Sequence, residues 1–262
     1  MTDASDESAF SDDGGARRDV GVLLCHGFTG SPSSLRPWAD HLVEAGYPVR
    51  LPLLPGHGTV WQDMNSTTFD DWLATVTASL AELSTRCRSV VVGGLSMGGT
   101  LALRLAELSA ERATDKIAGL VLVNPSVMST RLDAKFAPVL RKLQPVLLKV
   151  MPSLPGITDD LAKPGAQEKG YKRIPVAAAL SLQAAWKTVR RDLPLVTSPL
   201  LLLHSKVDHV VEPANAAIVL AEVSSTDRRE VLLENSYHVA TLDYDAELIF
   251  AESVTFIERV TA

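Results

Sequence analysis

The sequence predicts an α/β fold in which a mostly parallel sheet is flanked by helices on both sides. Short apolar runs alternate with longer segments of helical periodicity along most of the 262 residues. Runs that are apolar on both faces are typical of strands buried between two helical layers. A hydrophobic content of 46% is enough for one large core, so we expect a single globular unit that carries an insertion.

Six apolar runs are expected to form the strands of this sheet, over residues 20–25, 48–51, 89–92, 117–123, 199–204 and 229–233. Helices are expected between them, over residues 33–45, 68–83, 97–110, 213–223 and 243–260. Asp70 and Asp71 fall in the first turn of the second helix, where the helix dipole favours negative charge.

Two segments differ from this alternation. Residues 1–19 are acidic and rich in Ser and Gly, which is typical of a disordered tail and not of a signal peptide. Residues 126–193 are too long for an ordinary crossover and contain six prolines, so they predict an insertion of short helices, with helices over 136–151 and 176–189. The core is therefore expected to comprise residues 20–125 and 194–262.

The composition excludes several classes of function. A net charge of -6 leaves no basic face for a nucleic acid. The two cysteines, Cys25 and Cys87, provide neither a disulfide framework nor metal-ligand spacing, which favours a reducing compartment. No run approaches the roughly 20 apolar residues of a membrane helix, so we expect a cytoplasmic protein. No metal or cofactor is expected, because residues 53–58 are typical of a turn and residues 93–98 do not form a dinucleotide-binding pattern.

The most informative motif is Gly94, Ser96 and Gly98 in a G-x-S-x-G pattern. A predicted strand leads into it and a predicted helix leads out, which is the setting of a nucleophile elbow. The abrupt turn strains the serine backbone, and glycines two residues before and after it relieve crowding. Ser96 is therefore the expected nucleophile. The alternative is a glycine-rich turn in which the serine merely caps the helix.

A serine nucleophile needs a histidine base that is oriented by a carboxylate, and in this kind of sheet the chain order is Ser, acid, His. Asp208 follows the predicted strand 199–204, and His238 follows the predicted strand 229–233. Both therefore belong to loops at the carboxyl edge of the sheet. His209 is the main rival to His238, and Glu212 is the alternative to Asp208.

The remaining candidates have structural interpretations. His41 lies inside a predicted helix and His204 ends a predicted buried strand. Asp243 is expected to cap the final helix. His26 precedes a glycine and is expected to brace its loop by hydrogen bonds.

A tetrahedral intermediate also requires backbone N–H donors for its oxyanion. The residue after the nucleophile, Met97, supplies one at a helix start, and Phe28, in the loop that follows the first predicted strand, supplies the other. Gly27 allows the close approach of this loop. The side chains of Phe28 and Met97 would flank an acyl pocket or simply pack in the core.

These motifs together resemble the α/β-hydrolase superfamily, and within it the small bacterial carboxylesterases and monoacylglycerol lipases. The resemblance rests on residues 26–30, 53–58, 70–72, 93–99, 204–211 and 236–243, in the family's order. It implies that residues 126–193 form a small helical cap over an acyl pocket. The apolar residues of that cap would touch a lipid surface transiently or pack on the main domain.

The resemblance implies a serine carboxylic ester hydrolase that acts through an acyl-enzyme on short- to medium-chain esters, monoacylglycerols among them. Thioesterase, amidase and acyltransferase activities use the same triad and stay open as alternatives. So does a non-catalytic, ligand-binding member of the fold.

Overall fold

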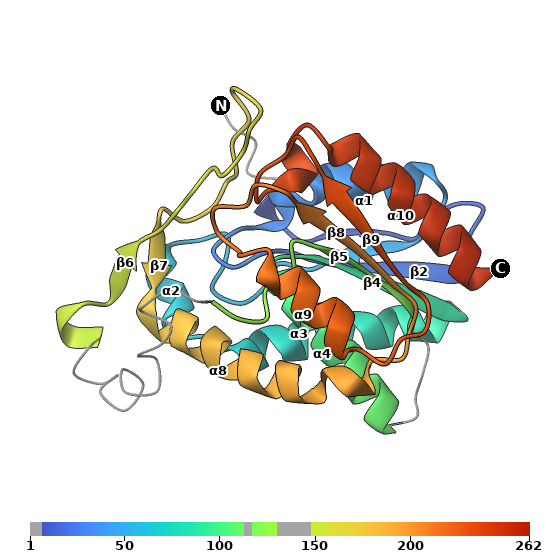
Figure 1. Ribbon diagram of the computed structural model, residues 1–262, viewed down its shortest axis with the longest axis horizontal. Helices are drawn as coiled ribbons and strands as arrows, with labels where there is room; N and C mark the ends of the chain where they lie inside the picture. Colours follow the sequence, from blue (N-terminus) through green and yellow to red (C-terminus); the bar gives the residue numbers. More distant parts are fainter. Residues whose placement is uncertain (1–6, 113–116, 130–147) are drawn as a thin grey trace.

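A seven-stranded sheet with helices on both faces forms the centre of the molecule (Figure 1). The computed structural model describes residues 7–112, 117–129 and 148–262. The strand order is β1-β3-β2-β4-β5-β8-β9, and only the pairing of β1 with β3 is antiparallel. The strands are β1 Phe10–Asp12, β2 Val20–Cys25, β3 Val49–Leu51, β4 Ser89–Leu95, β5 Ile117–Val123, β8 Leu200–Ser205 and β9 Arg228–Leu233. The predicted α/β class and all six predicted strands are confirmed.

The helices divide between the two faces of the sheet (Figure 1). One face is covered by α1 (Arg36–Glu44) and α10 (Ala246–Thr261), and the other by α3 (Phe69–Arg86), α4 (Met97–Arg112), α8 (Val176–Asp192) and α9 (Ala214–Glu222). Successive strand residues point to opposite faces, so Val91 of β4 packs in one core and Val92 in the other. This two-sided burial explains why the strands are apolar throughout.

Local signals fix several element ends. The Asp71 carboxylate accepts a hydrogen bond from the Thr68 N–H (2.8 Å) and thereby caps the N-terminus of α3. The predicted helix 33–45 divides into the short 3-10 helix η2 (Pro32–Ser34) and α1. The strand β4 extends to Leu95, beyond the predicted end, because Gly93 and Gly94 still pair with β2.

The N-terminal segment corrects one prediction. Residues 10–12 are not disordered but form β1 at the sheet edge, paired with β3. The buried Arg50 side chain of β3 donates to the carboxylates of Asp13 (2.7 Å) and Glu82 (2.9 Å). The guanidinium of Arg36 also lies 4.0 Å from the centre of the Phe10 ring. Composition indicated a charged, solvated tail, but it did not reveal the buried cation that holds this tail.

The predicted insertion contributes a hairpin and a helix. Its strands, β6 (Ser153–Pro155) and β7 (Arg173–Pro175), pair antiparallel, and α8 follows directly. The predicted helix over 176–189 is confirmed as α8, which packs against α3 and α4. The helix predicted over 136–151 lies mostly outside the described residues. The hairpin and the one-turn helix α2 (Trp61–Met64) are too short for a periodic signal.

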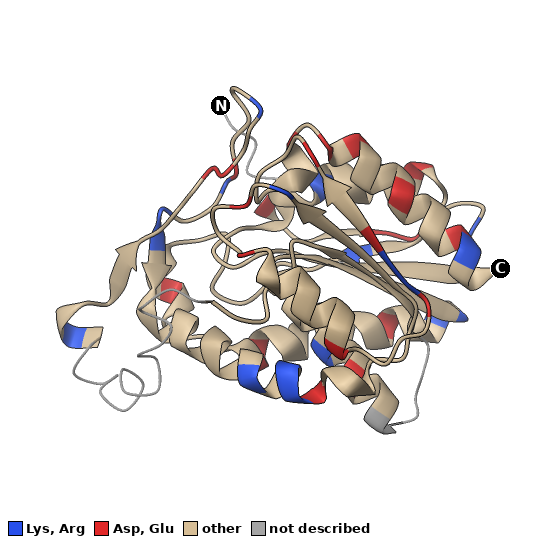
Figure 2. Ribbon diagram, in the orientation of Figure 1, with Lys and Arg blue, Asp and Glu red and all other residues tan. Residues whose placement is uncertain are grey.

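Basic and acidic side chains are intermixed over the described surface (Figure 2). Several form ion pairs that link neighbouring elements, such as Arg190 with Glu222 between α8 and α9, and Arg229 with Glu252 between β9 and α10. Pairs at such exposed positions contribute little to stability.

We expect Arg50→Leu to lower the free energy of unfolding by about 1–3 kcal/mol, because it removes charge-assisted hydrogen bonds from a buried guanidinium. Urea titration followed by circular dichroism measures this loss. The matched control is Arg86→Leu, since the exposed Arg86 also binds Asp13 and should cost no more than about 0.5 kcal/mol. Equal losses for the two variants would contradict a structural role for the Arg50 cluster.

Candidate active site

Ser96 occupies the sharp turn between β4 and α4. Its φ angle is 57°, in the left-handed region that a residue with a side chain rarely adopts. A Cβ on Gly94 would lie 2.3 Å from the backbone of Gly98, and a Cβ on Gly98 would lie 1.8 Å from the carbonyl oxygen of Cys25. Only glycines fit at these two positions, as the sequence pattern predicts. The turn presents the Ser96 side chain at the carboxyl edge of the sheet.

Asp208 and His238 meet at the same edge. Asp208 lies in the loop after β8 and His238 in the loop after β9. The Nδ1 atom of His238 lies 2.8 Å from Oδ2 of Asp208, and the side chains are 9% and 0% exposed, respectively. The second carboxylate oxygen accepts hydrogen bonds from the N–H groups of Val210 and Val211, both at 2.8 Å. These bonds fix the carboxylate and leave the imidazole Nε2 as the atom available for a substrate or nucleophile.

The electrostatics of this pair stabilise its charges. Burial disfavours the protonated imidazole, but the Asp208 carboxylate outweighs that effect and raises the pKa of His238 above its ordinary value. Burial also opposes ionisation of Asp208, yet the imidazole and the two backbone N–H groups lower the pKa of this carboxyl below its usual range. Asp208 is therefore an anion at neutral pH.

Two backbone N–H groups in this part of the molecule have no hydrogen-bond partner among the described residues. They belong to Met97, at the start of α4, and to Phe28, in the loop after β2. His26 braces this loop, as predicted: its Nε2 accepts a hydrogen bond from the Leu54 N–H (3.2 Å). Burial lowers the pKa of His26 to about 3, so the ring stays neutral and keeps this acceptor.

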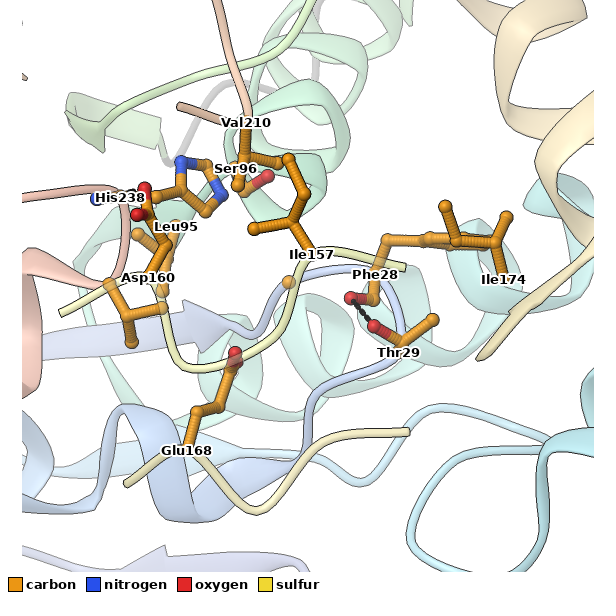
Figure 3. A pocket seen from close by; sticks show the side chains of 12 residues that line it. Phe28, Thr29, Leu95, Ser96, Ile157, Asp160, Glu168, Ile174, Val210 and His238 are labelled. Carbon is orange, nitrogen blue, oxygen red and sulfur yellow. Dashed lines mark hydrogen bonds between the residues drawn. The ribbon is translucent and has the colours of Figure 1, made fainter. Parts of the chain in front are cut away.

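Ser96 and His238 line one cavity, where the imidazole lies beside the serine side chain (Figure 3). The cavity has a volume of about 100 Å³. Part of its wall is apolar, formed by Phe28, Leu95, Ile157, Ile174, Val210 and Val239. The polar part comes from Thr29, Asp160 and Glu168. Such a mixed wall is typical of a site for an amphiphilic ligand.

Asp160 and Glu168 were missed by sequence reasoning. Both belong to the insertion, between β6 and β7, where no motif singles out an acidic residue. The pKa of Glu168 is raised to about 7, and burial of the carboxyl is the largest cause. Neither residue could have been assigned to the site from the sequence, because that assignment depends on how the insertion folds over the core.

The rival candidates have other positions. His209 binds Asp160 through Nδ1 (2.7 Å), and its ring packs edge-on against Tyr237 at 4.7 Å. Asp208, and not Glu212, is the carboxylate bonded to His238. His204 is buried in β8, and His41 lies in α1 with its ring 5.6 Å from that of Phe250.

The interpretation of Asp243 as a helix cap is wrong. Helix α10 begins at Ala246 with Asp245 at its N-cap position. The Asp243 carboxylate instead accepts hydrogen bonds from the N–H groups of Ala162 and Lys163 in the insertion and from that of Tyr237. It thus fastens the insertion to the loop that carries His238.

The described residues contain no cluster of three His, Cys, Asp or Glu side chains that could hold a metal ion. Among the described helices, none has the length and apolar character needed to span a membrane. An elbow serine, a carboxylate-bound imidazole and two N–H groups at one sheet edge define the class of α/β-hydrolases.

Comparison with known proteins agrees with this class. The family model described as serine aminopeptidase S33 matches residues 16–245. The chain is 41% identical over 240 residues to a thermostable monoacylglycerol lipase of Bacillus sp. (strain H-257), covering 92% of this chain and 91% of the relative. It is 27% identical to a carboxylesterase of Bacillus subtilis (strain 168), covering 92% and 94%. A solved structure from work on two metagenome-derived lipolytic enzymes superposes with a TM-score of 0.87 at 35% identity, covering 97% and 98%.

The chain therefore belongs to the serine aminopeptidase S33 family of α/β-hydrolases. It is a serine hydrolase of carboxylic esters, which confirms the enzyme class predicted from the sequence.

We expect Gly98→Ala to lower the free energy of unfolding by about 3 kcal/mol. The added Cβ would collide with the backbone carbonyl of Cys25, which can move only if the end of β2 moves with it. The displaced loop should also lower kcat for ester hydrolysis about 100-fold. Gly15→Ala is the control, since its Cβ has its nearest neighbour at 3.8 Å. Urea titration and steady-state kinetics on both variants measure the effects, and a fully active Gly98→Ala enzyme would refute the close-packed elbow.

Proposed function

We propose that this chain hydrolyses monoacylglycerols and related short- to medium-chain esters through an acyl-enzyme on Ser96. The observation that carries the proposal is the cavity that holds Ser96 beside a His238 imidazole bonded to Asp208. The cavity's mixed wall suits an ester with a polar alcohol and an apolar acyl group. The 41% identity to a monoacylglycerol lipase supports the same substrate class.

In the proposed mechanism, the Nε2 atom of His238 takes the proton from the Ser96 hydroxyl while its oxygen attacks the ester carbonyl. The oxyanion of the tetrahedral intermediate accepts hydrogen bonds from the N–H groups of Phe28 and Met97. The protonated imidazole then gives its proton to the leaving alcohol. Water repeats the sequence on the acyl-enzyme and releases the carboxylic acid.

Asp208 has two roles in this scheme. Its hydrogen bond to Nδ1 holds the imidazole in the tautomer that leaves Nε2 free to accept a proton. Its negative charge stabilises the imidazolium that forms during each half-reaction. Both roles depend on the carboxylate staying ionised, as its lowered pKa indicates.

The exposed side chains of the insertion support a further proposal. Val150, Met151 and Ile157 of the insertion are exposed apolar side chains, and we infer that they make transient contact with lipid aggregates.

We also propose a cytoplasmic location, with which the two buried thiols, Cys25 and Cys87, agree.

Ser96→Ala should lower the hydrolysis of a C8 or C10 monoacylglycerol on the order of 10³-fold or more, because the nucleophile is lost. The matched control is Ser225→Ala, which removes another buried hydroxyl far along the chain in the turn before β9. Titrating the released fatty acid measures both. Undiminished turnover by Ser96→Ala would end the proposal.

A substrate panel in the same assay separates the alternatives. Because the matched family is described by an aminopeptidase, the panel includes an aminoacyl anilide together with an acyl-CoA thioester and p-nitrophenyl esters. Acyl transfer is followed with glycerol as the acceptor. We expect the highest kcat/KM for the oxygen esters, and a preference for the anilide would contradict the proposal.

We expect kcat/KM to fall about tenfold per pH unit on the acid side, with a midpoint above the value of about 6.5 that is usual for histidine. The sign follows from the base role: the protonated imidazole has no free lone pair, and the Asp208 carboxylate favours that protonated form. A profile from pH 5 to 9 with a soluble short-chain ester measures the midpoint. An acid limb centred well below 6.5 would exclude His238 as the base.

A further inference from the structure

Asp160, like Glu168, is an acidic side chain of the active-site cavity that the acyl-transfer steps do not use. It comes from the insertion, between β6 and β7, and its side chain is 9% exposed. It lines the cavity together with Ser96 and His238 (Figure 3).

The hydrogen bonds of Asp160 join two separate loops. Its Oδ2 accepts from the backbone N–H of His238 (3.1 Å) and from that of His209 (3.2 Å). Its Oδ1 lies 2.7 Å from Nδ1 of the His209 ring. Its own carbonyl oxygen accepts from the Val239 N–H (3.2 Å). One residue of the insertion thus bonds to both loops that carry the imidazole–carboxylate pair.

This arrangement bears on the geometry of the pair. Asp208 follows β8 and His238 follows β9, so each residue belongs to a loop at the end of a different strand. The bond between their side chains fixes the ring only if the two loops keep their spacing. A charged acceptor shared by the neighbouring backbone groups of both loops supplies that constraint, and bonds to an ionised acceptor are stronger than neutral ones.

We propose that Asp160 is a positioning residue: it holds the loop of His238 at a fixed distance from the loop of Asp208, and it makes the alignment of the imidazole with Ser96 depend on the insertion being seated. The proposal rests on the catalytic roles given above. It assigns Asp160 no contact with the reacting atoms.

A fastening role alone would give a different result, and Asn65 provides the comparison. Its side chain donates to the carbonyl oxygen of Pro152 (2.9 Å) and accepts from the N–H of Ala177 (3.0 Å). Asn65 therefore also holds the insertion to the core by two hydrogen bonds. Neither of these two hydrogen bonds goes to the His238 loop or to the Asp208 loop.

Asp160 also acts on His238 through its charge. The carboxylates that face the imidazole are Asp208, Glu168 and Asp160, and all three favour its protonated form. Burial, together with the charge of His238, lowers the pKa of His204 in β8. Removing the charge of Asp160 should therefore lower the pKa of His238 and move the acid limb of kcat/KM to lower pH.

The test compares Asp160→Asn with Asn65→Ala in the full chain, using a soluble short-chain ester. We expect Asp160→Asn to lower kcat about 10- to 100-fold with little change in KM, because a misplaced imidazole slows chemistry without weakening binding. Its acid limb should shift to lower pH. Asn65→Ala should lose thermal stability but keep a kcat and a pH profile close to those of the wild type.

His209→Ala is the second variant, because its side chain is 52% exposed and its loss leaves the core intact. It removes the shortest bond of Asp160 and should lower kcat in the same direction by a smaller factor. The proposal would be overturned if Asp160→Asn kept the kcat and the acid limb of the wild type. It would also be overturned if Asn65→Ala lost as much kcat as Asp160→Asn. Retained turnover in Ser96→Ala would instead contradict the proposed function itself.

Discussion

The turn at Ser96 is the constraint on which the rest of the site depends. Its left-handed backbone lies between β4 and α4, and it forms only because Gly94 and Gly98 let the helix start pass within contact of the β2 loop. The same approach places the loop that carries Phe28 beside the turn that carries Ser96 and Met97. A single backbone conformation therefore sets the position of the proposed nucleophile and of both proposed oxyanion donors.

The second organising feature is the contact between the insertion and the loops at the carboxyl edge. Asp243 reaches from the core into the insertion, and Asp160 reaches from the insertion to the loops of His209 and His238. One carboxylate of the core thus bonds to the insertion, and one carboxylate of the insertion bonds to the core. Residues of the insertion thus line the cavity and also bond to the loop that carries the proposed base, His238.

Much of this arrangement could be predicted from the sequence, because it follows from local rules. The strands could be identified as apolar runs. The nucleophile elbow could be identified as a glycine pattern between a strand and a helix. The placement of Asp208 and His238 followed from the chain order of such sheets. The two wrong predictions concern residues whose partners are distant in the chain. Arg50 of β3 bonds to Asp12 and Asp13 at the end of β1, and Asp243 binds a backbone group 80 residues away. Asp160 and Glu168 carried no signal, since their surroundings come from the folding of the insertion.

In the mechanism that we propose, residues from three distant parts of the chain act together on one ester carbonyl. The most direct measurement is a crystal structure of the enzyme inactivated by a medium-chain alkyl phosphonate, which mimics the tetrahedral intermediate. We expect phosphorus bonded to the Ser96 oxygen, the phosphonyl oxygen within hydrogen-bond distance of the Phe28 and Met97 N–H groups, and Nε2 of His238 facing the ester oxygens. Phosphorus on a different side chain, or an imidazole turned away from the adduct, would contradict it.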